Sequence, residues 1–177
     1  MAETGIRAAN RARLERDILA HASETIAESG AAGLTLRGVA ARVGIAPSAI
    51  YRYYPGIDSL LTALIIEAYQ DLGDAAQTAS TAPGPAEERV LRACHAVRSW
   101  AIAQPHRYAL IYGTPVAGYA APPDTIGPAS AVGEVLARIL AEAGPDEVAH
   151  LPAPPAPPVA PRTVDDALAS QLGMPPA

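Results

Sequence analysis

Hydrophobic residues recur at helical spacing along most of this chain, and no strand pattern appears. Apolar stripes with a period near 3.6 predict helices over residues 7–29, 57–79, 85–104, 106–112 and 128–143. The segment 85–104 is apolar nearly all round, which is typical of a helix at the centre of its bundle. The first six residues are expected to be frayed. The pattern therefore predicts an all-α protein.

Residues 34–54, LTLRGVAARVGIAPSAIYRYY, predict two further short helices joined by a tight turn. Thr35 can cap the first helix, because its hydroxyl can accept a bond from an unpaired backbone N–H. Gly44 can end that helix with a positive φ, and Pro47 suits the first turn of the next helix. The second helix, roughly residues 47–53, leaves polar and aromatic side chains exposed. These features predict a helix-turn-helix whose second helix enters the major groove of DNA, rather than a packing corner in a bundle.

The charge distribution favours this interpretation more than the net charge of −5 does. Residues 1–55 hold seven Arg against five acidic residues, whereas residues 56–177 hold six against thirteen. A basic N-terminal third on an acidic body would keep phosphate contacts local. The Arg cluster at residues 7–16 either touches the DNA backbone or is a solvated face paired with Glu15 and Asp17.

Composition bears on where in the cell the protein is expected and on its disulfides. Half of the residues are hydrophobic, but no run approaches the length of a membrane span. The Arg-rich start has no apolar segment behind it and does not resemble a secretion signal, so we expect a cytoplasmic protein. The single cysteine, Cys94, excludes an internal disulfide.

Residues 7–79 closely resemble the DNA-binding domain of TetR-family transcriptional regulators. The resemblance is carried by the long helix before residues 34–54, by the turn at Gly44-Ile45, and by Ile50-Tyr51-Arg52-Tyr53-Tyr54-Pro55 followed by a helix that opens with Leu60-Leu61. It implies an all-helical homodimeric repressor that binds a palindromic double-stranded DNA operator and is released by a small-molecule effector, expected to be largely apolar. Residues 1–55, completed by the helix 57–79, would form the DNA-binding domain, and residues 80–177 the ligand-binding and dimerisation domain.

The resemblance also assigns DNA contacts to positions of this chain. It implies Thr35 on a phosphate, Arg37 on a base or the backbone, Pro47, Ser48 and Ala49 on bases, and Tyr51 and Tyr53 on phosphates and the groove wall, with Arg52 exposed between them. An Arg at position 37 can pair with guanine, and the methyl of Ala49 can touch a thymine methyl.

The chain departs from the family pattern at three places. Ile57 stands where the family usually has a Lys that reaches a phosphate, so one charge contact per monomer is expected to be missing. Ala46 replaces the polar residue that usually caps the second helix. Family members also end in a long helix that forms the dimer interface, whereas this chain has only a short helical candidate at residues 164–172.

Residues 98–128 resemble the ligand domain of the family type named for a Trp-His-Gly signature, with RYALIYGTPVAGY as the core of the match. We expect an effector pocket lined by Trp100, Tyr108, Tyr112, Tyr119 and Val97. The alternative is an aromatic core, but Tyr hydroxyls buried in a bundle need partners that a ligand could supply. Residues 145–161 contain seven prolines and are expected to form a polyproline II spacer. The alternative is a segment that docks on an SH3-like partner.

No catalytic constellation, phosphate-binding loop or set of metal ligands stands out. His95 and His106 belong to different helices, and Cys94 beside His95 points to another face. We therefore predict no enzymatic activity, no metal and no cofactor. Two alternatives are a helical sensor or scaffold without DNA binding, suggested by Ala46, Ile57 and the acidic net charge, and a small helical enzyme.

Overall fold

The computed structural model describes the backbone of residues 2–144 and the side chains of residues 8–144. Within residues 2–144 the chain forms helices and turns and no strand, which confirms the all-α prediction. The elements are α1 (Ala2–Ser29), the 3₁₀ turn η1 (Ala31–Gly33), α2 (Leu36–Val43), α3 (Pro47–Ile50), α4 (Ile57–Ser80), α5 (Ala86–Ala103), α6 (Pro105–Tyr112), the 3₁₀ turn η2 (Pro123–Thr125) and α7 (Ile126–Glu142). The proline segment 145–161 and the predicted helix 164–172 lie outside the described residues.

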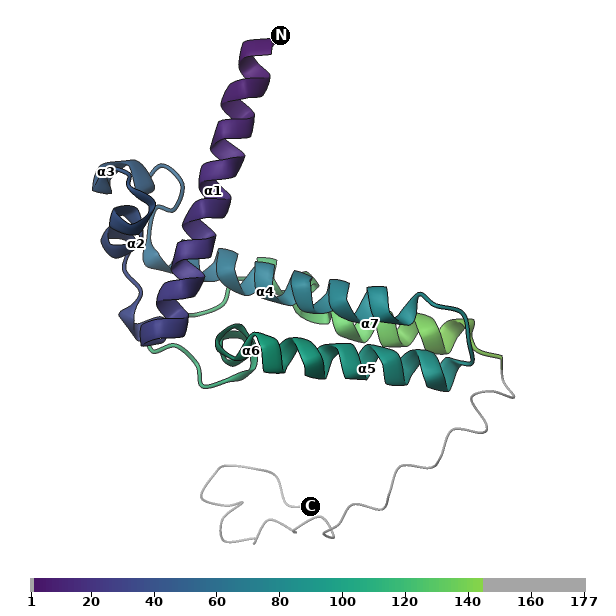
Figure 1. The fold of residues 1–177 in the computed structure, drawn as a ribbon. Helices are drawn as coiled ribbons and strands as arrows, with labels where there is room; N and C mark the ends of the chain where they lie inside the picture. The colour runs from purple at the N-terminus through teal and green to yellow at the C-terminus, as the bar shows by residue number, and fades with distance from the viewer. Residues whose placement is uncertain (1, 145–177) are drawn as a thin grey trace, which may run out of the picture.

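Helix α1 crosses the N-terminal end of the molecule, with α2 and α3 beside its C-terminal half (Figure 1). It begins at Ala2, so the prediction of a frayed segment before Arg7 was wrong for the residues that the structure describes. Once a helix has nucleated, each added residue gains a backbone hydrogen bond, which lets α1 extend beyond its apolar face. The N-terminal half of α1 stands clear of the other helices in Figure 1, and the side chains of residues 8–13 are exposed.

The first four helices close around one core of large aliphatic side chains. Its buried members are Ile18, Ala22 and Ile26 of α1, Leu34, Leu36, Val39 and Ala40 at α2, Ile50 of α3, and Leu60, Leu61 and Leu64 of α4. The stripe predicted for residues 7–29 and the one predicted for residues 57–79 therefore face each other. This packing fixes α2 and α3 against α1 and α4.

Helix α4 continues into the second half of the molecule, where α5 and α7 lie along it (Figure 1). The buried cluster here is made mostly of small side chains: Ala76, Ala86, Ala93, Val135 and Ile139. A Cβ atom added at Gly73 would lie 2.6 Å from the Cβ of Ala131, so α4 and α7 approach closely only because position 73 is a glycine. An ion pair between Arg89 and Glu142, 2.8 Å long, joins α5 to α7.

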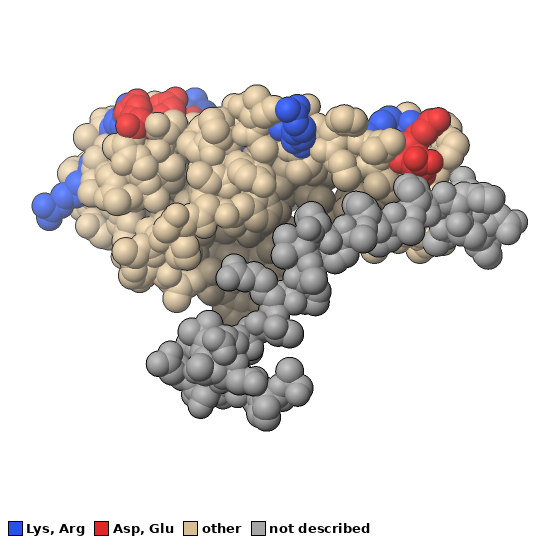
Figure 2. Space-filling view, turned by 90° about the horizontal axis from the view of Figure 1, so that it is seen from below, with Lys and Arg blue, Asp and Glu red and all other residues tan. Residues whose placement is uncertain are grey.

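Helix α5 does not occupy the centre of the bundle, and that prediction was wrong. It buries only Ala86 and Ala93, whereas Leu91 is 50% exposed and Ile102 is 63% exposed. The central helix is α4, which contacts α1, α5, α6 and α7. Apolar residues all round α5 therefore leave an uncovered apolar face in the described part of the chain. The face of the molecule drawn in Figure 2 is accordingly broad and mostly uncharged, with its charged side chains toward the edges.

Two helix starts also differ from the prediction. Helix α7 begins at Ile126, directly after η2, rather than at Pro128. Proline is tolerated in the first turn of a helix, because the N–H that it lacks would be unpaired there anyway, so Pro128 does not mark the boundary. Pro85 is the N-cap of α5 rather than its first helical residue.

Candidate nucleic-acid interface and adjoining cavity

The turn between α2 and α3 is built from the local signals that the sequence predicted. Thr35 has extended backbone angles, and its hydroxyl accepts a 3.1 Å hydrogen bond from the Gly38 N–H, so it caps α2 as predicted. Gly44 ends α2 at a φ of 77°, and its N–H and that of Ile45 donate to carbonyls of the last turn at 3.2 and 3.0 Å. Because L side chains avoid this region of backbone space, glycine sets the direction in which α3 leaves the corner.

Helix α3 is shorter than predicted and ends at Ile50 rather than near Tyr53. The N–H groups of Arg52 and Tyr53 bond to carbonyls three residues back, at 3.2 and 2.9 Å, so the chain tightens into turns there. Pro55 disfavours helical backbone at Tyr54, so no further helical turn follows these residues. Ala46 makes no side-chain cap, as predicted, although its carbonyl accepts the Ala49 N–H at 2.8 Å.

The predicted DNA contacts form an exposed surface around this corner. Thr35, Arg37, Pro47, Ser48, Tyr51 and Arg52 are exposed, while Ala49 and Tyr53 are half-buried. Neither Arg37 nor Arg52 has an ion-pair partner among the described residues, so both guanidinium groups are available. By contrast, Arg42 pairs with Glu28 at 2.6 Å and donates to the Thr25 hydroxyl at 2.9 Å, which ties α2 to α1. The hydrogen bond from Arg42 lowers the pKa of the Glu28 carboxyl.

One member of the N-terminal Arg cluster contacts a residue of the corner between α2 and α3. The Arg11 guanidinium lies 5.3 Å from the centre of the Tyr53 ring, and its Nε donates to Glu15 at 3.0 Å. This stack holds Tyr53 against α1, a cation–π contact that the sequence did not reveal. Arg13 and Arg16 are exposed, and the side chain of Arg7 lies outside the described residues.

A hollow of about 540 Å³ opens where the N-termini of α2 and α4 meet. Its lining consists of Leu34, Thr35, Leu36, Arg37, Tyr51, Gly56 and Ile57. The first N–H groups of any helix lack partners within the helix and carry partial positive charge, so two converging N-termini favour an anion. The Arg37 guanidinium and the Tyr51 hydroxyl add donors to the same hollow. Ile57 lies in it too, where a basic residue would have added a further charge.

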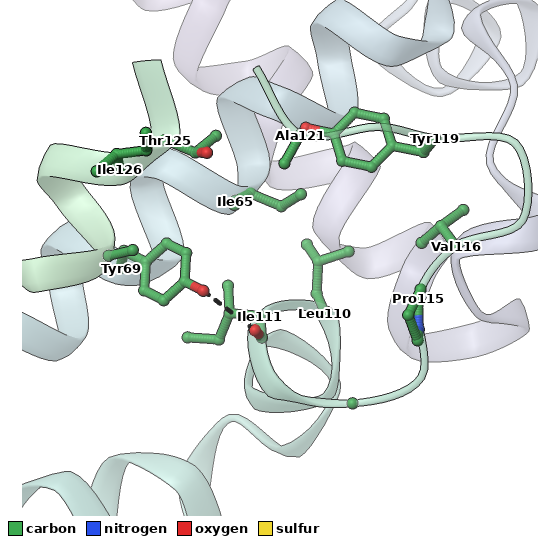
Figure 3. Close-up of a pocket in the computed structure, with 12 residues that line it drawn as sticks. Ile65, Tyr69, Leu110, Ile111, Pro115, Val116, Tyr119, Ala121, Thr125 and Ile126 are labelled. Carbon is green, nitrogen blue, oxygen red and sulfur yellow. Dashed lines mark hydrogen bonds between the residues drawn. The ribbon is translucent and has the colours of Figure 1, made fainter. Parts of the chain in front are cut away.

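A second cavity, of about 430 Å³, lies between α4, α6 and the segment that leads into α7. It is lined by Ile65, Tyr69, Leu110, Ile111, Gly113, Pro115, Val116, Tyr119, Ala121, Thr125, Ile126 and Ala129. Figure 3 shows the rings of Tyr69 and Tyr119 on opposite sides of this space, with Ile65 and Leu110 between them. Its size falls in the range of small-molecule sites.

Of the five residues predicted to line a pocket, Tyr119 lines this cavity. Trp100 instead lies against the Arg107 guanidinium, 5.4 Å from the ring centre to the Arg carbon, and Val97 packs against the small-residue cluster of the second half. Tyr108 and Tyr112 are exposed, with Tyr112 edge-on to Tyr69 at 5.8 Å. The sequence did hold a signal for the missed residues, because Ile65 and Tyr69 are four apart on α4 and share one face.

Polar contacts join the two halves beside this cavity. The Tyr119 and Thr62 hydroxyls are 2.9 Å apart, and His106 Nε2 lies 3.2 Å from the Ser23 hydroxyl of α1. Arg107 of α6 forms ion pairs with two residues of α4, with Asp71 at 2.7 Å and with Glu67 at 3.8 Å.

This polar region perturbs three ionisable groups. Burial raises the pKa of Glu67, with the charge of Arg107 opposing and that of Asp71 adding to it. Burial and the Arg107 charge lower the pKa of His106. Burial, with the charges of Glu15 and Glu67, raises the pKa of Tyr54 to about 12.

Two negative findings apply to the described residues. No three His, Cys, Asp or Glu side chains come together as metal ligands in this part of the chain. Among residues 2–144 no helix is long and apolar enough to cross a membrane.

A capped helix, a glycine turn and a short exposed second helix on a three-helix core define a helix-turn-helix protein. Comparison with known families agrees with this class. Residues 18–64 match the family described as bacterial regulatory proteins, tetR family, and residues 90–169 match the family described as tetracyclin repressor-like, C-terminal domain. Over both of these segments the chain is similar to the tetR family. The Trp-His-Gly type expected for its second half stays a prediction.

Individual relatives and solved structures show the same similarity. HTH-type transcriptional regulator Rv1816 of Mycobacterium tuberculosis (strain ATCC 25618 / H37Rv) is 42% identical over 125 residues, a match that covers 69% of this chain and 53% of the relative. HTH-type transcriptional regulator Mb1846 of Mycobacterium bovis matches equally, so the chain spans about half the length of these curated relatives.

Among solved structures, the crystal structure of SCO4313, described as a regulatory protein, has a TM-score of 0.68 and 38% identity, covering 75% of this chain and 64% of that one. The TetR-family regulator PfmR of Thermus thermophilus shares the fold, with a TM-score of 0.58 at 20% identity, covering 88% of this chain and 79% of that one.

Proposed function

We propose that this protein is a DNA-binding transcriptional regulator that acts as a repressor, binds a palindromic operator as a homodimer and is released by a small-molecule effector. The observation that carries the proposal is the hollow where the N-termini of α2 and α4 meet beside Arg37 and Tyr51. A DNA phosphate fits this combination of unpaired N–H groups, a free guanidinium and a phenol.

The surface next to the hollow supplies the sequence-reading part. Ser48 and Ala49 on α3 would face base edges, because α3 projects from the corner with its apolar side, Ile50, completely buried. Arg37 and Arg52 carry the charge that this surface needs, and the Arg11–Tyr53 stack orders its edge. Thr35 and Pro47 would contact the phosphate backbone and a base at its rim.

Release by an effector is supported by the place of the second cavity. Ile65 and Tyr69 bring α4 into its wall, while Gly56 and Ile57 at the start of the same helix line the hollow. A ligand that binds better to one position of α4 would shift the population between DNA-competent and incompetent forms, by no more than its difference in affinity for the two.

The decisive test is selection of DNA by the full chain from a random duplex library, followed by binding measurements on the selected sequence. We expect an inverted repeat to emerge. The double variant Arg37→Ala/Tyr51→Ala should then bind it about a hundredfold more weakly, since two buried or charge-assisted contacts are lost from each protomer.

Arg138→Ala is the matched control, because Arg138 is an exposed Arg on α7, outside the hollow, the corner and the uncovered face of α5. Its removal changes the net charge equally and should leave the affinity within about twofold. If no sequence is enriched, or if the double variant binds like the Arg138 variant, the alternative of a helical sensor or scaffold without DNA binding replaces this proposal. Ile57 and Ala46 are the observations that favour that alternative.

The dimer is best supported by the uncovered face of α5. Leu91 and Ile102 are eleven residues apart, which puts them on one side of the helix, and both are at least half exposed. Sedimentation of the wild type should give a dimer, and Leu91→Glu/Ile102→Glu should shift it to monomer. Glu87→Ala/Glu88→Ala, at exposed acidic positions of the same helix, serves as the control. A dimer that survives the first double variant would show that this face is not the interface.

A further inference from the structure

The cavity beside α4 offers an unusual selection of polar groups. None of its lining residues carries a charged side chain. Its only side-chain polar atoms are the hydroxyls of Tyr69, Tyr119 and Thr125. What a ligand could bind there therefore depends on where the three hydroxyl hydrogens already point.

The Tyr119 hydroxyl is committed as a donor. It lies 2.9 Å from the Thr62 hydroxyl, and the Thr62 hydroxyl donates its one hydrogen to the Asp58 carbonyl at 2.8 Å. Thr62 can then only accept from Tyr119, so the hydrogen of Tyr119 is directed at α4. Its oxygen keeps acceptor capacity toward the cavity.

The other two hydroxyls are committed in the same way. Tyr69 donates to the Ile111 carbonyl at 3.1 Å, which is the dashed contact in Figure 3. Thr125 donates to the Pro122 carbonyl at 2.7 Å. Each hydrogen lies on a protein acceptor, and each oxygen retains unused lone pairs. The side chains of the cavity thus offer hydrogen-bond acceptors and no free donor.

We propose that the cavity selects an uncharged, mainly apolar molecule that carries a hydrogen-bond donor, such as a phenol, an alcohol or an amide N–H, with the Tyr119 oxygen as its acceptor. The proposal deepens the effector role given above and rests on it for its regulatory meaning. A carboxylate would enter a wall without a cation or a free side-chain donor, and an ether or ester oxygen would face the lone pairs of the three hydroxyls.

A set of naphthalenes tests the ligand class, because its members share one apolar body. The probes are 2-naphthol as the donor, 2-methoxynaphthalene as the acceptor and 2-naphthoate as the anion, measured by displacement of Nile red from the full chain without DNA. We expect 2-naphthol to bind about tenfold or more tightly than either of the others. Equal or tighter binding of the ether or the anion would overturn the proposal, as would the failure of all three to bind.

Two variants test the hydrogen-bond direction itself. Thr62→Val has nearly the same shape but removes the acceptor for Tyr119, which frees the Tyr119 hydrogen for the cavity. This variant should bind 2-methoxynaphthalene about tenfold more tightly than the wild type does. Tyr119→Phe removes the acceptor and should reduce the preference for 2-naphthol to within about threefold. Circular dichroism checks that both variants are folded.

The hydroxyls of Tyr69 and Thr125 are tested as alternative hydrogen-bond acceptors for the ligand. Tyr69→Phe and Thr125→Val are measured alongside, since either oxygen could share the role of Tyr119. If none of the three single removals lowers the preference for the phenol, the acceptor argument is wrong. If one does, the ligand class is upheld and that oxygen is its anchor.

The outcome separates ligand class from regulation. If 2-naphthol binds as expected and DNA affinity does not change with it, the cavity has the proposed selectivity but the effector role is wrong. If the chain binds its selected DNA and no naphthalene binds, the DNA-binding proposal stands and the ligand class is overturned.

Discussion

The two halves of this molecule differ in the size of the side chains that they bury and in the kind that they expose. The first half, α1 to the start of α4, buries large aliphatic side chains such as Ile18, Ile50 and Leu60 completely and exposes polar and charged ones. The second half buries several alanines beside fewer large side chains such as Leu72 and Ile139, and among the described residues it leaves Leu91, Ile102 and other large apolar side chains exposed. The first half therefore has a closed aliphatic core, whereas the described part of the second half has an exposed apolar surface and a cavity.

The largest expected effect comes from making the same substitution in both halves. Leu60→Ala opens a cavity in the closed core, because Leu60 is 0% exposed, and should lower the free energy of unfolding by about 2–5 kcal/mol. Leu140→Ala on α7 removes a side chain that is 41% exposed and should cost less than about 0.5 kcal/mol. Urea unfolding followed by circular dichroism measures both. Similar losses would mean that Leu140 is covered in solution and that the two halves differ less than described.

A smaller effect is expected at the close approach of α4 and α7. Gly73→Val would push against Ala131, so it should destabilise the protein by about 1–3 kcal/mol through overpacking. Gly133→Val on the same pair of helices is the control, because nothing lies within 4 Å of a Cβ added there. The fluorescence of Trp100, the only tryptophan, follows unfolding of the second half. A Gly73 variant as stable as the Gly133 variant would contradict the tight contact.

The cap of α2 should contribute about 1 kcal/mol to stability. Thr35→Ala leaves the Gly38 N–H without its partner and should destabilise the first half by about 0.5–2 kcal/mol. Thr35→Ser keeps the hydroxyl and should recover most of that loss. Thr81→Ala, which removes an exposed hydroxyl bonded to Gln77 at the other end of α4, is a suitable comparison. Equal stability of the Ala and Ser variants at position 35 would argue against the cap.

The smallest effect expected is a pH dependence at the contact between the halves. Burial and the Arg107 charge lower the pKa of His106 below its usual 6.5, so the unfolded chain binds more protons than the folded one below that pH. The contribution of His106 to stability is thus present above 6.5 and is lost as the pH falls through that value toward the folded pKa.

His106→Gln should flatten this decline, measured as the urea midpoint between about pH 5.5 and pH 8. The comparison variant is His95→Gln, at an exposed position on α5. The raised pKa of Glu67 acts in the opposite sense at lower pH, since it lets the folded state hold a proton more readily. The difference between the two His variants isolates His106 from that effect. Identical slopes in the two variants would rule out the contribution.

The features that could be predicted from sequence are those set by a few neighbouring residues. Thr35 as a cap, Gly44 in left-handed backbone and Ile50 buried under the corner each follow from chemistry within about one helical turn. The length of α3 could not be predicted from hydrophobic spacing, because the change to hydrogen bonds three residues back at Arg52 and Tyr53 leaves no mark in that spacing.

The second half could not be predicted from local patterns for a different reason. Trp100 and Tyr108 are of the residue types that often line pockets. Which residues line a cavity, however, depends on how α4, α6 and the segment before α7 pack. Tyr69 lies on α4, far in sequence from Trp100 and Tyr108. Likewise, apolar residues all round α5 indicate that each of its faces should be buried. They do not indicate whether the same chain or another molecule buries them.

One consequence of the shared helix α4 concerns evolution. Leu64 packs in the core that holds the corner between α2 and α3, and its neighbour Ile65 lines the cavity. A change on α4 that retunes the cavity therefore also risks the corner. The segment 113–121 has mostly exposed or half-buried side chains and supplies the cavity wall opposite α4. Under the proposed effector role, descendants of this protein that respond to new molecules should carry their substitutions in that segment, while α4 changes slowly.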